Sequence, residues 1–311
     1  MIEVRNLVKQ YDKLTALYGI SFTLNDGAAL GILGQSGSGK STLLNILCGC
    51  LSPTSGSIIL NGIDMRRHPK ECKRLIGYMP EKPPLYSEMT VSEYLKFSCS
   101  LKRIGKADIA DEMKRVKHAV NLEAEDSLLC SDLSIADKQK LSLCQTIVGN
   151  PEILIFDDPT KGLENSKAEE LLGIIKEVSK GKTVVFASRL LTECIDLCEN
   201  VIIINRGRVA VNSTLAGLSA EISECTRLKL RVLAPRAVAR GLFRDMAEIS
   251  DIELQTADEK GAVDIVLTYP TKCDLREKLW RYTQSAGVPV LEMKQLNISL
   301  EDIYLQLSGE R

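Results

Sequence analysis

The sequence has little of what marks metalloproteins, nucleic-acid-binding proteins or membrane-spanning proteins. Histidine occurs twice and tryptophan once, and aromatic residues make up only 5 % of the 311 residues. Forty lysines and arginines nearly balance 41 aspartates and glutamates, so the chain has no net basic field to hold nucleic acid. No apolar run approaches the roughly 18 residues that a membrane span requires. We therefore expect a globular protein that binds no nucleic acid and meets a membrane only through a partner.

The chain also lacks a secretion signal and a zinc motif. Its first residues, Met-Ile-Glu-Val-Arg-Asn, contain no apolar signal core. Ten cysteines are present, but their spacing fits no zinc site. Cys48 and Cys50 would point to different sides of a helix, and Cys194 and Cys198 share a helix face without a second pair. We expect reduced thiols and a cytoplasmic location.

The sequence does contain a phosphate-binding loop. Residues 34–42 read GQSGSGKST and match the pattern G-x-x-x-x-G-K-[ST]. An apolar run at 28–33 predicts a buried strand before the loop, and residues 41–51 predict a helix after it, whose N-terminus favours phosphate. We expect the loop to bind ATP, with Lys40 reaching the β- and γ-phosphates and Ser41 ligating Mg²⁺. The expected nucleotide-binding residues are Gly34, Gln35, Ser36, Gly37, Ser38, Gly39, Lys40, Ser41 and Thr42.

A pair of carboxylates follows a second apolar run. Residues 153–156 read Ile-Leu-Ile-Phe and predict a short buried strand that ends in Asp157 and Asp158. Asp157 is the natural partner of Mg²⁺, directly or through water. Asp158 lies next along the strand, where a base that activates water would sit. The alternative is that both aspartates are solvated residues of a strand-end turn without a chemical role. The Pro-Thr-Lys-Gly-Leu sequence that follows makes this alternative less favoured.

The order of these and further motifs resembles the ATPase domain of ABC transporters. Each short motif is weak alone, whereas the ordered set is specific. The end of the chain, residues 298–304, resembles the exporter branch that includes daunorubicin-resistance and gliding-motility ATPases. The matching segments are Tyr11, residues 16–22, the phosphate loop, residues 76–81 at the Q-loop, Leu133-Ser134 at the signature, the strand at 153–156, residues 162–164 at the D-loop and residues 187–189 at the switch.

The resemblance implies an α/β fold of the P-loop NTPase class. Residues 1–217 would form the ABC-type ATPase domain, with a RecA-like core and a helical subdomain at about 85–150. After a change in composition near 217–224, residues 218–311 predict a small α+β domain, whose β-α-β-β-α-β order suggests a ferredoxin-like module. Its expected strands are 227–233, 249–255, 262–268 and 288–296, and its expected helices are 235–246, 275–285 and 300–307.

The resemblance also implies roles and partners. Tyr11 would stack on adenine, with packing of a β-turn as the alternative. Glu81 would lie at the Q-loop, close to Mg²⁺ and the reacting phosphate, in the groove where a membrane permease docks. Ser134 would contact ATP in trans, because the family forms head-to-tail dimers in which each ATP lies between one P-loop and the other signature. The dimer partner would be a second ATPase domain, identical or different, at the inner face of the cell membrane.

Four chemical positions depart from the family. Asp158 replaces the catalytic glutamate, Arg189 replaces the switch histidine, and Glu81 replaces the Q-loop glutamine. Aspartate is shorter than glutamate by roughly 1.5 Å, and a misplacement near 1 Å can cost on the order of 10²-fold in rate. Arg189 cannot accept a hydrogen bond, although it can still grip a γ-phosphate. Residues 135–137, Ile-Ala-Asp, bring a Cβ and a negative charge where the signature has glycines and glutamine.

These departures predict that nucleotide binding is better preserved than hydrolysis. We expect an ATP-binding cytoplasmic subunit of an ABC exporter, which drives a separate permease through dimer closure and hydrolyses ATP slowly. The alternative is a regulatory ATP-binding subunit with negligible hydrolysis. A membrane-free ABC protein acting on ribosomes or DNA ranks lower, because the chain has one phosphate loop and no long coiled coil. A small-molecule kinase would not explain the other ordered motifs.

Overall fold

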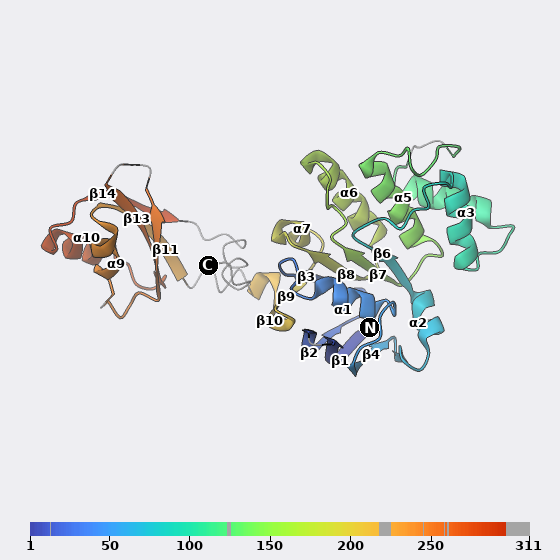
Figure 1. The fold of residues 1–311 in the computed structure, drawn as a ribbon, viewed down its shortest axis with the longest axis horizontal. Coiled ribbons are helices and arrows are strands. Elements are labelled where there is room, and N and C mark those ends of the chain that lie inside the picture. The colour runs from blue at the N-terminus through green and yellow to red at the C-terminus, as the bar shows by residue number, and fades with distance from the viewer. Residues whose placement is uncertain are drawn as a thin grey trace. The chain divides into compact units, whose positions relative to one another are not determined.

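The computed structural model describes residues 1–12, 14–122, 126–217, 225–244, 246–257, 259 and 261–296. They divide into two compact units, Met1–Leu215 and a second unit that begins at Ala216 (Figure 1). The helix expected at 300–307 and the segment 298–304 lie outside the described residues. Within the described part of the chain, no helix has both the length and the apolar character needed to cross a membrane.

The first unit is built on a six-stranded sheet in the order β10-β9-β3-β8-β7-β6, in which only β10 is antiparallel to its neighbour. The central strands are almost continuously apolar, as expected where both faces of a parallel sheet are covered. The strands are β3 (Ala29–Leu33), β6 (Ile76–Met79), β7 (Ile153–Asp157), β8 (Thr183–Ser188), β9 (Asn200–Asn205) and β10 (Arg208–Thr214).

A second, antiparallel sheet faces the first across helix α1 (Lys40–Leu47) (Figure 1). Apolar and polar side chains alternate along these strands, so one face of the sheet packs into the core. Leu7, Leu17 and Leu43 are buried there together with Ile155 of the parallel sheet. The helix predicted at 41–51 is shorter than expected, because Gly49 takes a left-handed φ of 66° after the cap at Cys48. The strands are β1 (Ile2–Tyr11), β2 (Leu14–Leu24), β4 (Ser55–Leu60) and β5 (Ile63–Asp64).

Apolar spacing in the sequence predicts helices at 91–101, 107–121, 135–149, 166–179 and 191–198, and the structure has a helix within three residues of each of these bounds. Helix α3 begins with a capping box between Thr90 and Glu93. Helix α2 was not predicted, because a seven-residue helix is too short to show an apolar period, although Pro69 at its first turn is a helix-start signal. The helices are α2 (Pro69–Leu75), α3 (Val91–Leu101), α4 (Ile109–Ala119), α5 (Ile135–Ile147), α6 (Asn165–Val178) and α7 (Leu191–Ile195).

The second unit has a four-stranded antiparallel sheet in the order β12-β13-β11-β14. One face carries Leu228 and Leu230, which pack with Phe243 and Leu279 into a separate core. The first and third strands lie at the centre, as in a ferredoxin-like module. Helix α9 ends at Gly241, five residues before the predicted end. The elements are β11 (Cys225–Leu233), α9 (Arg236–Gly241), β12 (Asp251–Thr256), β13 (Ala262–Pro270), α10 (Arg276–Ser285) and β14 (Val290–Leu296).

Candidate functional site

The loop at residues 34–42 connects β3 to α1 and is closed by its own lysine. The Lys40 side chain is buried, and its Nζ donates to the carbonyl oxygen of Gly34 at 2.5 Å and to that of Gln35 at 3.4 Å. Burial lowers the pKa of Lys40, while the charges of Asp158 and Asp157 act in the opposite direction. The ammonium is therefore held at the loop by weak neutral acceptors, which phosphate oxygens can replace with stronger charge-assisted hydrogen bonds.

The glycines of this loop are required by close packing. Gly39 has a φ of 110°, and a Cβ there would lie 2.9 Å from the carbonyl oxygen of Ala16. At Gly34, a Cβ would lie 2.5 Å from the carbonyl oxygen of Ile204. Ser38 Oγ is buried, with no hydrogen-bond partner among the described residues. The loop therefore folds as a tight cradle whose backbone a side chain at either glycine would displace.

Asp157 and Ser41 meet at the C-terminal end of β7. The Asp157 carboxyl is only 3 % exposed, contacts the Ser41 hydroxyl, and leaves Oδ1 without a hydrogen-bond partner among the described residues. Burial raises the pKa of Asp157, so its charged form is disfavoured without a compensating cation. A hydroxyl beside a buried carboxylate oxygen is a donor set that suits Mg²⁺. These two residues fit the predicted metal site.

Asp158 and Arg189 contact each other directly. Asp158 is buried and has a left-handed φ of 44°. Its Oδ1 accepts a hydrogen bond from the Arg189 backbone N–H at 3.1 Å, and its Oδ2 lies 3.6 Å from Arg189 Nε. Both carboxylate oxygens of the expected base are therefore engaged by the residue at the switch position.

Glu81 is also engaged by a cation. Its carboxylate is ion-paired with the Lys161 ammonium, and this hydrogen bond lowers the pKa of Glu81. Both residues line the cavity above the phosphate loop. Lys161 is one of the site residues that sequence reasoning missed, although it lies in the Pro-Thr-Lys-Gly-Leu segment after Asp158.

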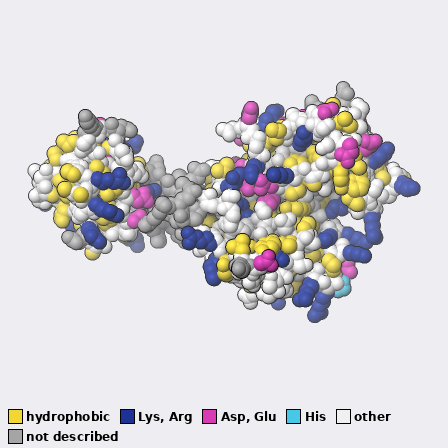
Figure 2. All heavy atoms as spheres, viewed as in Figure 1, with side chains coloured by type: hydrophobic (Ala, Val, Ile, Leu, Met, Phe, Trp, Pro, Cys, Tyr) yellow, Lys and Arg dark blue, Asp and Glu magenta, His cyan; other side chains and the backbone are white. Residues whose placement is uncertain are grey.

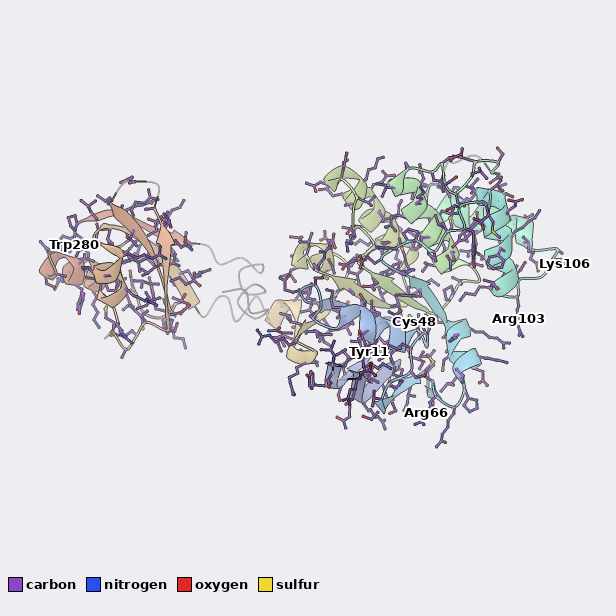
Figure 3. All side chains as sticks on the ribbon, in the orientation of Figure 1. Tyr11, Cys48, Arg66, Arg103, Lys106 and Trp280 are labelled. Atoms are coloured by element: carbon purple, nitrogen blue, oxygen red, sulfur yellow. The ribbon has the colours of Figure 1, made fainter. Side chains whose placement is uncertain are left out.

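The cavity above the loop has a volume of about 530 Å³. Tyr11 forms part of its wall and has the Lys9 ammonium 4.9 Å from its ring centroid. Tyr18 is a second aromatic wall residue, and Figure 3 marks Tyr11 on the same unit. The predicted residues that line the cavity are Tyr11, Gln35, Ser36, Gly37, Gly39, Lys40, Ser41, Thr42, Glu81, Asp158 and Arg189. The lining residues that sequence reasoning missed are Leu14, Thr15, Ala16, Tyr18, Lys161, Arg206 and Gly207.

Ser134 does not line this cavity. It caps α5, where its Oγ accepts a hydrogen bond from the Asp137 N–H at 3.1 Å and donates one to the Asp137 carboxylate at 2.6 Å. Its neighbour Ile135 is 61 % exposed. Within one chain, the signature segment is thus outside the cavity, and its serine hydroxyl is already used by Asp137.

Glu193 is a further residue that sequence reasoning missed. Its two carboxylate oxygens accept hydrogen bonds from the hydroxyls of Thr160 and Ser188, which are both buried. Thr160 lies two residues after Asp158, and Ser188 directly precedes Arg189. Glu193 therefore ties together the two loops that carry the Asp158 and Arg189 contact. No sequence pattern marked it, because the three residues come from separate segments.

We predict that Glu193→Ala lowers ATP turnover by about 10-fold, because small displacements of reacting groups are costly. ATP affinity should change by less than about 2-fold, since Lys40 and the glycine cradle are untouched. Steady-state ATPase assays and equilibrium ATP binding measure the two effects. Glu199→Ala, on an exposed glutamate six residues away, is the matched control. Unchanged turnover in Glu193→Ala, with unchanged thermal stability, would contradict a positioning role.

A second hollow lies between α3 and α4 and has a volume of about 1000 Å³. Its lining combines the apolar side chains of Phe97, Ile109 and Met113 with three exposed lysines at its rim, Lys96, Lys106 and Lys114. Lys117 also lines the groove and is ion-paired with Asp126, a further lining residue. We refer to it as the α3–α4 groove.

Comparison with known proteins gives the following matches. The family model described as "ABC transporter" matches residues 17–161. An uncharacterized ABC transporter ATP-binding protein of Bacillus subtilis, YxlF, is 28 % identical over 307 residues, covering 99 % of each chain. The linearmycin resistance ATP-binding protein LnrL of the same organism is 26 % identical, covering 99 % of this chain and 98 % of its own. The bacitracin transport ATP-binding protein BcrA of Bacillus licheniformis is 27 % identical, covering 99 % and 97 %.

Solved structures share the fold of the first unit. A dimeric ATP-binding cassette in a post-hydrolysis state with ADP and Pi aligns with a TM-score of 0.64 at 24 % identity, covering 69 % of this chain and 99 % of that one. The ATP-binding subunit of an ABC transporter aligns with the same TM-score at 26 % identity, covering 71 % and 92 %.

Proposed function

The chain carries an ATPase domain of the ABC transporter family, and on this premise we propose that it is the ATP-binding subunit of an exporter that works with a separate membrane permease. The predicted family, α/β P-loop fold and ATPase class are confirmed by the family match, the full-length relatives and the solved cassettes. The metal, the permease, the export direction and the rate of hydrolysis are parts of the proposal.

The observation that carries the proposal is the meeting of three groups around one cradle. Buried Lys40 faces the phosphate loop, and the unpartnered Asp157 oxygen lies beside Ser41. In the proposed complex, Lys40 binds the β- and γ-phosphates, and Ser41 and Asp157 hold Mg²⁺, which supplies charge neutralisation at the phosphates. Tyr11 stacks on the base from the cavity wall.

The dimer is the next part of the proposal. Ser134 and the N-terminus of α5 would reach the nucleotide of a second ATPase domain, because they lie outside the cavity of their own chain. In this arrangement, ATP binding closes the dimer and closure moves the permease. These contacts fit a homodimer, and they equally fit a heterodimer with a different ATPase domain.

Slow hydrolysis is supported by the contacts that the side chains of Asp158 and Ser134 already make. Asp158 has both oxygens engaged by Arg189, and the Ser134 hydroxyl donates to Asp137 instead of being free for a γ-phosphate. Because these contacts affect turnover and leave the phosphate cradle intact, they also favour the second candidate function, a regulatory ATP-binding subunit with negligible hydrolysis.

The resemblance implied a permease contact at Glu81, which lines the nucleotide cavity and not the α3–α4 groove. We propose that the permease also contacts the α3–α4 groove. Its apolar floor and lysine rim suit a short amphipathic segment with acidic residues, which a permease would present at the cytoplasmic side of the membrane. Full-length relatives named for linearmycin resistance and bacitracin transport support an export role. We accordingly propose a peripheral location at the inner face of the cell membrane.

Affinity purification from gently solubilised membranes tests this proposal. We expect one membrane protein to co-purify with the native chain, and we expect Lys96→Glu with Lys114→Glu to reduce its recovery by about 10-fold through charge repulsion at the groove rim. Lys176→Glu in α6 with Lys180→Glu in the turn after it is the charge-matched control. ATP binding should be equal in all three proteins. Recovery of ribosomes, or of no membrane protein, would contradict the transporter function.

A further inference from the structure

A cluster of cations on α2 and its preceding turn takes no part in the nucleotide site. Residues 66–74 read Arg-Arg-His-Pro-Lys-Glu-Cys-Lys-Arg, which places five lysines and arginines within nine positions of a chain whose net charge is −1. All five cationic side chains are exposed, and none forms an ion pair with another described residue. They are Arg66, Arg67, Lys70, Lys73 and Arg74.

Two neighbouring acids, Asp64 and Glu71, leave this cluster with a net positive charge. Asp64 Oδ1 accepts hydrogen bonds from the backbone N–H groups of Arg66 and Arg67, at 2.8 and 3.0 Å. Glu71 pairs with His68, with 3.1 Å between Nδ1 and Oε1. Asp64 therefore shapes the turn, and neither guanidinium group forms an ion pair with it or with Glu71.

The turn after α3 extends this cationic surface. Lys102 Nζ donates to the carbonyl oxygen of Ile76 at 2.6 Å, which fixes the end of α3 beside the residue that follows α2. In this turn, Arg103 and Lys106 are exposed, and Leu101 is 66 % exposed. Figure 3 places Arg66, Arg103 and Lys106 along one edge of the first unit, and Figure 2 shows dark blue side chains gathered there.

We propose that this surface, formed by the five cations of residues 66–74 with Arg103 and Lys106, binds the anionic headgroups of membrane lipids. Clusters of four to eight lysines and arginines are attracted to anionic leaflets. An exposed leucine among cations is typical of segments that lie in the interface. The segments that carry the surface, residues 66–74 and 101–106, contain no phenylalanine, tyrosine or tryptophan that would stack on a nucleic-acid base. The inference rests on the proposed function, which brings the domain to the inner face of the membrane.

Flotation of the full chain with lipid vesicles tests the inference without a permease. We expect binding to vesicles that contain about one third phosphatidylglycerol in phosphatidylcholine, little binding to pure phosphatidylcholine, and weakening by salt. Arg66→Gln, Arg67→Gln and Lys70→Gln combined should reduce the partition coefficient about 100-fold, since each cation near an anionic surface contributes about a factor of five. The charge-matched control is Lys167→Gln, Lys176→Gln and Lys180→Gln combined, in α6 and the turn that follows it.

The possible results distinguish a failure of the lipid inference from a failure of the proposed function. Equal partition into both vesicle types, or equal losses in the two triple variants, would overturn the lipid inference. So would retention on heparin without preference for anionic vesicles, which would favour a nucleic-acid or acidic-protein partner. ATP binding and permease recovery are measured on the same proteins, so their loss in the native chain would count against the proposed function and not against this surface.

Discussion

Lys40→Ala is expected to lower the affinity for Mg-ATP by at least about 100-fold. The buried ammonium is the cation that the phosphate cradle places at the nucleotide, and hydrogen bonds between charged groups contribute about 1.5–3 kcal/mol each. Two such contacts, to the β- and γ-phosphates, account for a loss of this size. Equilibrium binding of a fluorescent ATP analogue, with and without Mg²⁺, measures the change.

The control for Lys40→Ala is Lys82→Ala, because Lys82 is exposed, adjoins Glu81 and does not line the cavity. Removal of the buried ammonium leaves the carbonyl oxygens of Gly34 and Gln35 without their donor, so thermal melting must accompany the binding assay. Lys40→Met is a second variant that keeps most of the buried volume. Native-like affinity in a folded Lys40 variant would remove the basis of the proposed nucleotide site.

The phosphate cradle was predictable because its determinants are local. Gly34, Gly39 and Lys40 lie within seven positions and form a recognisable local pattern. The packing that requires the two glycines, against the carbonyl oxygens of Ile204 and Ala16, is visible only in the folded chain. Apolar runs at 28–33 and 183–188 predict strands whose bounds match β3 and β8 to within one residue, because buried strands of a parallel sheet are almost continuously apolar. Helix ends were less predictable, as the early end of α9 at Gly241 shows, because glycine is a weak helix former whose effect depends on tertiary packing.

The contacts between catalytic positions were not predictable from local pattern. Asp158 and Arg189 are 31 positions apart, and they meet because β7 and β8 are neighbours in register, with Asp157 paired to Ala187. The sequence indicated that Arg189 can still grip a γ-phosphate, and it gave no sign of the contact with Asp158 that the structure shows. Glu193 was missed for the same reason, because its hydrogen bonds to Thr160 and Ser188 depend on where α7 begins.

The combined variant Asp158→Glu and Arg189→His is expected to raise ATP turnover by about 100-fold. Glutamate restores the reach that aspartate lacks, and a misplacement near 1 Å costs about that factor. Histidine removes the guanidinium that lies 3.6 Å from Asp158 Oδ2 and supplies a ring nitrogen that can accept a hydrogen bond. Because the two side chains are in contact, the effects of the single variants should not add. Initial-rate assays at saturating Mg-ATP measure the gain.

Asp196→Glu with Arg281→His is the matched control for the combined variant, because both residues are exposed and neither lines the cavity. ATP affinity should stay within a few-fold of the native value, since the phosphate cradle is unchanged. A large gain would show that Asp158 and Arg189 hold hydrolysis down in the native chain, which favours the regulatory function. A native rate as high as that of the combined variant, with ATP binding intact, would instead contradict slow turnover. The chain would then be an exporter ATPase in which Asp158 positions water despite being one methylene shorter than glutamate.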